Sequence, residues 1–207
     1  MKFDIHLHSN YSDGANTPEE IIKYAKKIGL AGIAITDHDT ARGYLNAIDR
    51  NSKNKNFKII PGVEVTSKEG HILCLNAIPE ILPYTPAEEV IEKIHDEGGI
   101  AIAAHPYDKF RGGVSDLILK LNFDAIEVFN GRMIMSKKGI EELKKIADKR
   151  NIAKTGGSDA HSVREVGNVC IKINENEDPV DAIRKGIVEI VVEGKLKRKF
   201  DHLLSFL

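Results

Sequence analysis

The sequence has 207 residues, of which 42% are hydrophobic and 29% are charged, a composition typical of a folded globular protein. Lysine and arginine number 30 against 31 aspartates and glutamates, and the resulting net charge of −1 argues against a protein that coats duplex nucleic acid. No apolar run approaches the roughly 18 residues that a membrane-spanning helix requires, which argues against a helical membrane protein.

The N-terminus and the two cysteines favour a cytoplasmic location. Residues 1–9 read MKFDIHLHS, in which Asp4 and His6 interrupt the apolar core that a signal peptide would need. Cys74 and Cys170 lie in apolar, strand-like segments without CxxC spacing, so we expect two buried, reduced thiols rather than a disulfide.

Short apolar runs rich in Ile, Val and Ala alternate with longer segments of helical periodicity. In chain order, the pattern predicts strands at 3–8, 32–36, 59–66 (with a possible partner at 71–76), 100–104, 125–129, 153–155, 169–173 and 189–192. Helices are expected at 18–28, 41–50, 86–97, 114–121, 136–150, 179–186 and 197–206. The first helix has the clearest ends, because Thr17 suits its N-cap, Pro18 its first position and Gly29 its stop.

This alternation predicts an α/β fold in one domain, 1–207, with a parallel sheet and helices outside it. The polar segment 51–56 reads as a surface loop rather than a linker. An open doubly wound sheet and a closed barrel both fit the alternation. The barrel is favoured because almost every strand is followed by a polar, chemically capable residue, as expected when several strand ends surround one pocket.

The eight histidines are not scattered at random. Two lie inside predicted helices, His95 and His202. The other six end or follow predicted strands: His6, His8, His38, His71, His105 and His161. A single histidine is most simply explained as an ordinary surface or core residue, but six at strand ends indicate a shared site.

The first two strands end in ionisable clusters. His6 and His8 point to the same side of a strand, because strand side chains alternate, so both rings can bind one cation. Asp13 follows in a turn, where an Asx turn is the alternative explanation. In the segment TDHD, helix capping would explain Asp39 but requires neither His38 nor a second carboxylate.

Later strands carry similar groups. Glu64 lies among apolar residues in IIPGVEV, and a buried carboxylate there needs a cation partner, either Lys/Arg or a metal. His105 follows an apolar strand in AHP, and Asp159 and His161 form an i, i+2 pair in GGSDAH.

These residues make a set of nitrogen and oxygen donors without a thiolate. Imidazole and carboxylate suit Zn²⁺, Mn²⁺ or Fe²⁺ in open catalytic sites, whereas closed structural zinc sites usually contain cysteine. The candidate ligands are His6, His8, Asp13, His38, Glu64, His71, His105, Asp159 and His161. They exceed what one ion needs, and three divalent ions, two of them bridged by Glu64, would account for the number.

The strings FDIHLHSNYSDG, AITDHDTARG, GVEV, AHP and GSDAH occur in this order over residues 3 to about 170. Together they resemble the PHP (polymerase and histidinol phosphatase) family of metal-dependent phosphoesterases. The resemblance implies a distorted (β/α)7 barrel with a trinuclear metal site at the C-terminal rim of the strands. It implies one ion held by His6, His8, Glu64 and Asp159, a second by Glu64, His71 and His105, and a third by Asp13, His38 and His161.

Within that family, TDHDT and EVFNGR make the chain most similar to the nucleoside 3′,5′-bisphosphate phosphatase and 5′–3′ exoribonuclease group. Those enzymes carry a long insertion between the positions of His71 and His105, which helps to cover the substrate. Here only 33 residues, 72–104, lie between these positions, so the resemblance supports the hydrolytic core but does not extend to nucleotide specificity.

A metal-dependent phosphoric ester hydrolase is the leading expectation. Metal ions lower the pKa of bound water toward about 7 and neutralise phosphoryl oxygens. We expect a metal-activated hydroxide beside Glu64 to attack a small phosphomonoester, for which a nucleotide is one candidate. His161 or a metal-bound water would assist the leaving group, and Arg132 and Arg164 are candidate phosphate contacts.

Three alternatives stay open from the sequence: an amide or C–N hydrolase of similar barrel architecture, a 5′–3′ exonuclease acting on short oligonucleotides, and a non-catalytic, metal-stabilised module. The expected partner is a small phosphorylated substrate or a short oligonucleotide, not a membrane or duplex nucleic acid. Asp37 and Asp39 are candidates for orienting the site, with helix capping or turn formation as the alternative.

Overall fold

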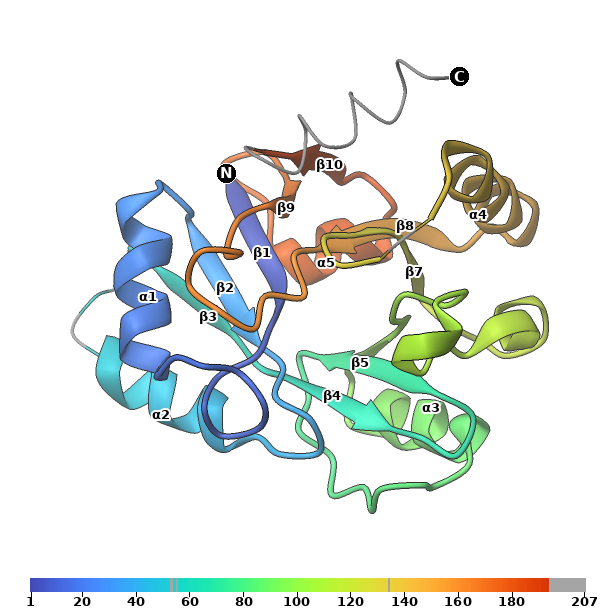
Figure 1. Cartoon of the computed structure of the whole chain (residues 1–207), viewed down its shortest axis with the longest axis horizontal. Coiled ribbons are helices and arrows are strands. Elements are labelled where there is room, and N and C mark those ends of the chain that lie inside the picture. The colour runs from blue at the N-terminus through green and yellow to red at the C-terminus, as the bar shows by residue number, and fades with distance from the viewer. Residues whose placement is uncertain (53, 55, 134, 194–207) are drawn as a thin grey trace.

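The computed structural model describes residues 1–193 except 53, 55 and 134. Its strands form two five-stranded sheets (Figure 1). The first has the order β10-β9-β1-β2-β3, with β1 (Lys2–Leu7), β2 (Gly32–Ile35), β3 (Lys58–Ile60), β9 (Val169–Lys172) and β10 (Glu189–Val192). The second has the order β4-β5-β6-β7-β8, with β4 (Gly62–Thr66), β5 (His71–Leu75), β6 (Ile100–Ala103), β7 (Ala125–Asn130) and β8 (Ala153–Gly157).

The α/β class is confirmed, but the strands form two mixed sheets rather than the expected parallel sheet. β1, β2 and β3 run parallel, as do β6, β7 and β8. β5 is antiparallel to both β4 and β6, and β9 is antiparallel to β1 and β10. Only residues 67–70 separate β4 from β5, and so short a connection can join only antiparallel neighbours.

The single strand expected at 59–66 is in fact two strands in different sheets. β3 ends at Ile60 and β4 begins at Gly62, with Pro61 between them. Proline has no N–H to donate to a ladder and holds its φ near −65°, so it suits a point where the chain leaves one sheet for the other. Pro61 thereby places Glu64 in the second sheet, opposite β1.

Five α-helices and two 3₁₀-helices are found among the described residues: α1 (Pro18–Lys27), α2 (Arg42–Asn51), α3 (Ala87–Asp96), α4 (Lys137–Arg150), α5 (Pro179–Arg184), η1 (Lys109–Arg111) and η2 (Ser115–Leu119). The expected start of α1 is confirmed, because Thr17 and Glu20 form a reciprocal capping box and Pro18 opens the helix. The expected helix at 197–206 lies outside the described residues.

The helix expected at 114–121 is present, but it is the short 3₁₀-helix η2 at Ser115–Leu119. Leu117 donates to the Val114 carbonyl in a short i to i+3 turn. Arg150 Nη1 donates to the carbonyls of Ile118 and Leu121 at 2.9 and 3.2 Å. Those two carbonyls therefore already have a partner from another element of the fold.

Three apolar clusters hold the layers together. α1 and α2 cover the first sheet on its outer side, and α3 and α4 cover the second (Figure 1). Between the sheets lies a shared cluster that includes Phe3 and Ile5 of β1, Leu73 of β5 and Ile102 of β6. Two isolated bridges, Leu7 to Ala160 and His38 to Glu64, bring the sheets together at one end.

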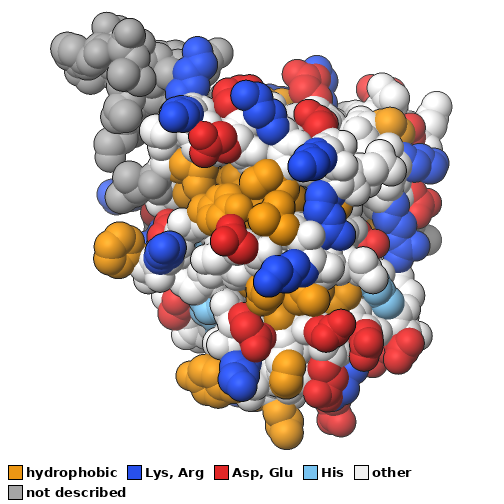
Figure 2. Space-filling view, turned by 90° about the vertical axis from the view of Figure 1, so that its right-hand side faces the viewer, with side chains coloured by type: hydrophobic (Ala, Val, Ile, Leu, Met, Phe, Trp, Pro, Cys, Tyr) orange, Lys and Arg blue, Asp and Glu red, His pale blue; other side chains and the backbone are white. Residues whose placement is uncertain are grey.

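The surface carries mixed charge. On the face in Figure 2, basic and acidic side chains are interspersed, with small hydrophobic areas between them. Both cysteines are buried and free, as expected. Within the described part of the chain, none of the helices combines the length and the apolar character needed to cross a bilayer.

Candidate metal centre

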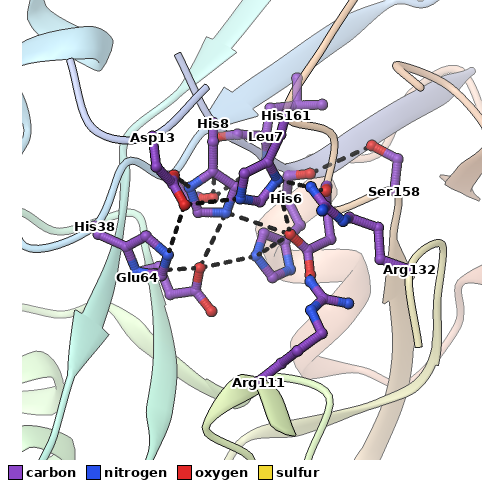
Figure 3. A network of polar contacts seen from close by, with 12 residues as sticks. His6, Leu7, His8, Asp13, His38, Glu64, Arg111, Arg132, Ser158 and His161 are labelled. Atoms are coloured by element: carbon purple, nitrogen blue, oxygen red, sulfur yellow. Dashed lines mark hydrogen bonds and ion pairs between the residues drawn. The ribbon is translucent and has the colours of Figure 1, made fainter. Parts of the chain in front are cut away.

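All nine candidate ligands lie together at the end where the two bridges join the sheets. Figure 3 shows His6, His8, Asp13, His38, Glu64 and His161 of this set. They come from strand ends and the loops that follow: His6 and His8 from β1 and its end, Asp13 from the next loop, His38 after β2, Glu64 from β4, His71 from β5, His105 after β6, and Asp159 and His161 after β8. The sequence-predicted set is therefore brought together in full. Its role in metal binding stays a prediction.

His71 reaches the site through the hairpin rather than through a parallel strand end. It is the first residue of β5 and pairs with Thr66, the last residue of β4. Because β5 runs in the opposite direction, its beginning stands at the same rim as the end of β4.

Glu64 is the centre of the arrangement. Its Oε2 atom lies 3.1 Å from His6 Nε2, 3.0 Å from His8 Nε2 and 3.6 Å from His38 Nδ1. Its Oε1 atom lies 3.3 Å from His71 Nδ1 and 3.2 Å from His105 Nε2. One buried carboxylate therefore contacts five imidazole rings from four segments of the chain.

Asp13 and His161 extend the site toward solvent, and the buried Asp159 joins them to its interior. His161 Nε2 lies 3.0 Å from Asp13 Oδ2, and its Nδ1 lies 3.5 Å from Asp159 Oδ1. Asp159 Oδ1 is also 3.5 Å from His8 Nε2. The side chain of Asp13 is 52% exposed, whereas that of His8 is fully buried, so the site has an open and a closed side.

The two aspartates that flank His38 do not cap α2. The N-cap of that helix is Ala41, which makes no side-chain capping bond. Asp39 Oδ1 instead accepts a hydrogen bond from the Thr66 backbone at 2.7 Å, and Asp37 accepts bonds from Ser9 and Ser12. Both carboxylates therefore hold loops that border the site.

Burial and charge act in opposite directions on the titrating groups. Burial would raise the pKa of Glu64, but the surrounding imidazoles, His6 first, hold it well below its ordinary value. The pKa of Asp159 is likewise lowered despite burial, by His6, His8 and Arg111. Burial would lower the pKa of His8, yet Asp159 and Glu64 raise it to about 9. The site therefore holds buried negative charge that requires protons or other cations beside it.

The donor set fits divalent metal ions. Three groups have ligand atoms within 4.8 Å of one another: His8, Asp13, His38 and His161; His6, His8 and Glu64; and His38, Glu64 and His71. Several buried ring nitrogens lack a hydrogen bond of good geometry despite nearby carboxylates, namely both of His8 and Nδ1 of His38, His71 and His105. Nitrogen and oxygen donors of this kind suit Zn²⁺, Mn²⁺ or Fe²⁺.

The arginines differ from the sequence expectation. Arg111, which the sequence analysis did not select, contacts Asp159 Oδ2 with Nη2 and lies 3.5 Å from Asn130 Oδ1 with Nη1. Arg132 is exposed and lies on the same side of the site as Arg111 in Figure 3. Arg164 is exposed, and none of the described contacts of the site involves it, so its role stays a prediction.

Glu127 is a second residue that the sequence analysis did not select. It is fully buried in β7, and its Oε1 atom accepts a hydrogen bond from His6 Nδ1 at 2.9 Å. A signal was available, because Glu127 sits in an apolar strand just as Glu64 does. Arg111 offered no comparable signal, because it lies in a polar loop before two glycines.

Residues 4–193 match the family model of the PHP domain, so the chain belongs to the PHP domain family and the resemblance is confirmed. An uncharacterized protein of Methanocaldococcus jannaschii, MJ1587, is 38% identical over 143 residues, which are 63% of this chain and 82% of that protein. The 5′-3′ exoribonuclease Rnm of Escherichia coli is 37% identical over 79 residues, 36% of this chain and 27% of that enzyme.

Among solved structures, a two-domain protein from Bacteroides vulgatus superposes with a TM-score of 0.75 at 19% identity. The superposition covers 98% of this chain and 69% of that one, which is described as containing a predicted PHP-like metal-dependent phosphoesterase. This likeness shows that the two proteins share a fold.

Proposed function

We propose that the protein is a metal-dependent phosphoesterase that hydrolyses a small phosphomonoester. The observation that carries the proposal is the arrangement around Glu64, where one buried carboxylate contacts five imidazoles and several of their nitrogens lack hydrogen bonds. Membership of the PHP domain family supports the same reading.

Three ions would occupy the site in this proposal. The first would be held by His6, His8, Glu64 and Asp159, the second by Glu64, His71 and His105, and the third by Asp13, His38 and His161. The three groups of closely spaced donors support that number, although they divide the histidines slightly differently. Bound divalent ions would lower the pKa of water to supply hydroxide and would neutralise phosphoryl oxygens.

The two sheets would act together as one distorted (β/α)7 barrel, with β1, β2 and β4 to β8 around the shared core and the site at its rim. The Leu7–Ala160 and His38–Glu64 bridges and the apolar cluster between the sheets support this view.

Two arginines would bind the phosphate. Arg111 already contacts a carboxylate of the site, and Arg132 lies on the same side. A guanidinium presents paired N–H groups that match phosphate oxygens, and two of them suit the dianion of a monoester.

His161 can serve the leaving group only through Nε2. Its Nδ1 donates to the main-chain carbonyl of Asp159 at 3.0 Å, so that atom carries a proton. Nε2 lies 3.0 Å from Asp13 Oδ2. This nitrogen can either carry a proton for the leaving group or bind an ion, but it cannot do both. If Nε2 supplies the proton, His161→Gln should slow an alkyl phosphate far more than p-nitrophenyl phosphate, whose leaving group needs no proton. Equal losses would assign His161 to an ion.

The proposal is tested with purified protein, Mn²⁺ and p-nitrophenyl phosphate or a nucleotide. We expect release of inorganic phosphate, loss of that release on chelation, and loss in His8→Ala and Glu64→Gln. Glu20→Gln, which changes only the α1 capping box on the surface, is the matched control and should keep full activity. Phosphate release that survives both chelation and His8→Ala would refute the metal assignment.

A 5′–3′ exonuclease on short oligonucleotides is the second candidate, favoured by the similarity to the Escherichia coli exoribonuclease over 79 residues. Short 5′-phosphorylated oligonucleotides separate the two candidates. Stepwise release of mononucleotides would support the exonuclease, whereas release of inorganic phosphate from mononucleotides alone would support the monoesterase.

A further inference from the structure

Glu127 is a fully buried carboxylate that belongs to none of the three groups of closely spaced donors. It lies in β7 between Ile126 and Val128, which are also fully buried. Among the described residues, no lysine or arginine forms an ion pair with it, although a buried carboxylate is costly unless it is paired or hydrogen-bonded.

Three N–H groups from three parts of the chain satisfy this carboxylate. Its Oε1 atom lies 2.9 Å from His6 Nδ1 in β1. Its Oε2 atom accepts from the His105 backbone at 3.0 Å and from Asn130 Nδ2 at 3.0 Å. Glu127 therefore links β1, the loop after β6 and the end of β7.

An irregularity in β7 makes the contact with Asn130 possible. Residues three apart on a regular strand face opposite sides. The pairing of β7 with β8 shifts register between Glu127 and Phe129, and Asn130 Nδ2 reaches both Glu127 and Asp159 Oδ2, the latter at 3.1 Å. Through Asn130, the same carboxylate influences the orientation of Asp159.

The contact with His6 decides which ring nitrogen faces the site. Glu127 Oε2 accepts from two N–H groups and Oε1 is the acceptor that faces His6 Nδ1, so Nδ1 is the donor in this contact. In the neutral ring, Nε2 then holds the lone pair, and it faces Glu64 Oε2 at 3.1 Å and Asp159 Oδ1 at 3.8 Å. A lone pair that faces two carboxylates needs a proton or a metal ion between them.

The surroundings leave little freedom for another arrangement. A Cβ atom at Gly157 would lie 2.5 Å from His6 Cβ and 3.0 Å from Glu127 Oε1, so the pair fits only against glycine. His105 has a φ of 29°, which residues other than glycine rarely adopt. Its backbone N–H donates to Glu127. The hydrogen bond helps to hold that conformation.

We propose that Glu127 is a positioning residue that fixes the ring of His6 with Nδ1 protonated and Nε2 turned toward Glu64, ready to bind a divalent ion. The inference rests on the proposed function, because it assumes that His6 binds an ion. Partners of this kind orient metal-binding histidines in many proteins, and their removal typically costs about 10-fold to 100-fold in metal affinity.

The first experiment uses the wild-type chain loaded with Zn²⁺ and labelled with ¹⁵N. Long-range ¹H–¹⁵N correlation spectra report the state of each ring nitrogen of His6. We expect a protonated Nδ1 and an ion-bound Nε2. The opposite assignment, with Nδ1 bound to the ion, would overturn the proposal without any variant having to fold.

The second experiment compares Glu127→Gln with Asp4→Asn by calorimetric titration with Zn²⁺ or Mn²⁺. Glutamine has nearly the same shape as glutamate, but its NH₂ group would face one or more of the N–H groups that now donate to Glu127. We expect about 10-fold to 100-fold weaker binding and a changed His6 spectrum. Asp4 is the matched control, because it is a buried carboxylate of β1 that accepts from the Ser158 and Gly167 backbone and meets His6 only at the backbone N–H, at 3.5 Å, not at the ring.

The outcomes separate this inference from the function on which it rests. Wild-type affinity and an unchanged His6 spectrum in Glu127→Gln would overturn the positioning role alone. An equal loss in Asp4→Asn would also overturn it, because any buried carboxylate would then have the same effect. A wild-type chain that binds no divalent ion would refute the proposed function itself.

Discussion

The carboxylate of Asp37 accepts two hydrogen bonds from Ser9, one from the backbone N–H at 2.6 Å and one from Oγ at 2.7 Å. Ser12 Oγ donates a third at 2.8 Å. Ser9 and Ser12 belong to the loop that carries Asp13, and Asp37 directly precedes His38. One buried carboxylate therefore ties together the segments that supply Asp13 and His38 to the open side of the site.

Replacing Asp37 should loosen this loop. Asp37→Ala leaves the Ser9 backbone N–H without its acceptor in a buried place, and we expect a loss of about 1–3 kcal/mol in the free energy of unfolding. The bound metal per chain should also fall, because Asp13 loses its support. Denaturant unfolding and elemental analysis measure the two effects. Ser12→Ala removes one of the three bonds and should cost less. Unchanged metal content in Asp37→Ala would contradict the link to Asp13.

Arg111 should act on substrate binding more than on the chemical step. With Arg111→Gln we expect KM for a phosphomonoester, and the inhibition constant of inorganic phosphate, to rise by about 10-fold or more, as for the loss of a charge-assisted contact. kcat should change less. Steady-state kinetics at saturating Mn²⁺ measure both constants, and Arg50→Gln, at the exposed end of α2, is the control. An unchanged KM with lower metal content would instead assign Arg111 to holding Asp159.

Removal of metal should lower the thermal stability of the protein. An ion that binds only the folded state stabilises it by about 2.7 kcal/mol at 100 times its Kd, which corresponds to roughly 5–10 °C in Tm for a chain of this size. Calorimetry of chelator-treated protein with and without added Mn²⁺ or Zn²⁺ measures the shift. Mg²⁺ at the same concentration should give a smaller one, because the donors are mainly imidazoles. Equal Tm values in all samples would count against a metal site.

Local chemistry made most helices predictable. The Thr17–Glu20 capping box and Pro18 mark the start of α1, and the helix begins there. The antiparallel direction of β5 follows from the short connection at residues 67–70. The chain passes from the first sheet to the second at Pro61, which lies inside the segment that the sequence predicts as one strand. The carbonyls of Ile118 in η2 and of Leu121 just after it accept hydrogen bonds from Arg150, which lies 29 or more residues away along the chain. Such long-range partners leave no local pattern.

The site was predictable to the extent that its groups follow apolar strands. Polar residues at strand ends share one rim, so His6, His38 and His105 could be expected to meet before any contact was known. Glu127 and Arg111 act through partners 121 and 48 residues away, His6 and Asp159. The apolar strand around Glu127 indicates its burial, but the partners of both residues follow only from the tertiary arrangement.

The acid sensitivity of α5 provides a test of the fold that is independent of the metal site. Asp178 is the N-cap of α5, where Oδ1 accepts from the backbone of Val180 at 2.9 Å and of Asp181 at 3.2 Å, and Oδ2 contacts Lys58 of β3. Partial burial would raise the pKa of Asp178, but Lys58 and the two N–H groups hold it below the ordinary value of 3.8.

Because the folded-state pKa of Asp178 is depressed, its stabilising effect is fully present above pH 3.8 and is lost as the pH falls through the lower folded value. Asp178→Ala should cost about 1 kcal/mol in the free energy of unfolding at pH 7, as for other N-caps. Asp178→Asn keeps an acceptor for the helix and should cost less.

Urea unfolding between pH 7 and 3 should show that the stability advantage of the wild type over Asp178→Asn shrinks below pH 3.8. Asp181→Asn, on the exposed side of the first turn, is the control. A difference between wild type and Asp178→Asn that stays constant across this range would show that the Lys58 contact does not stabilise the fold.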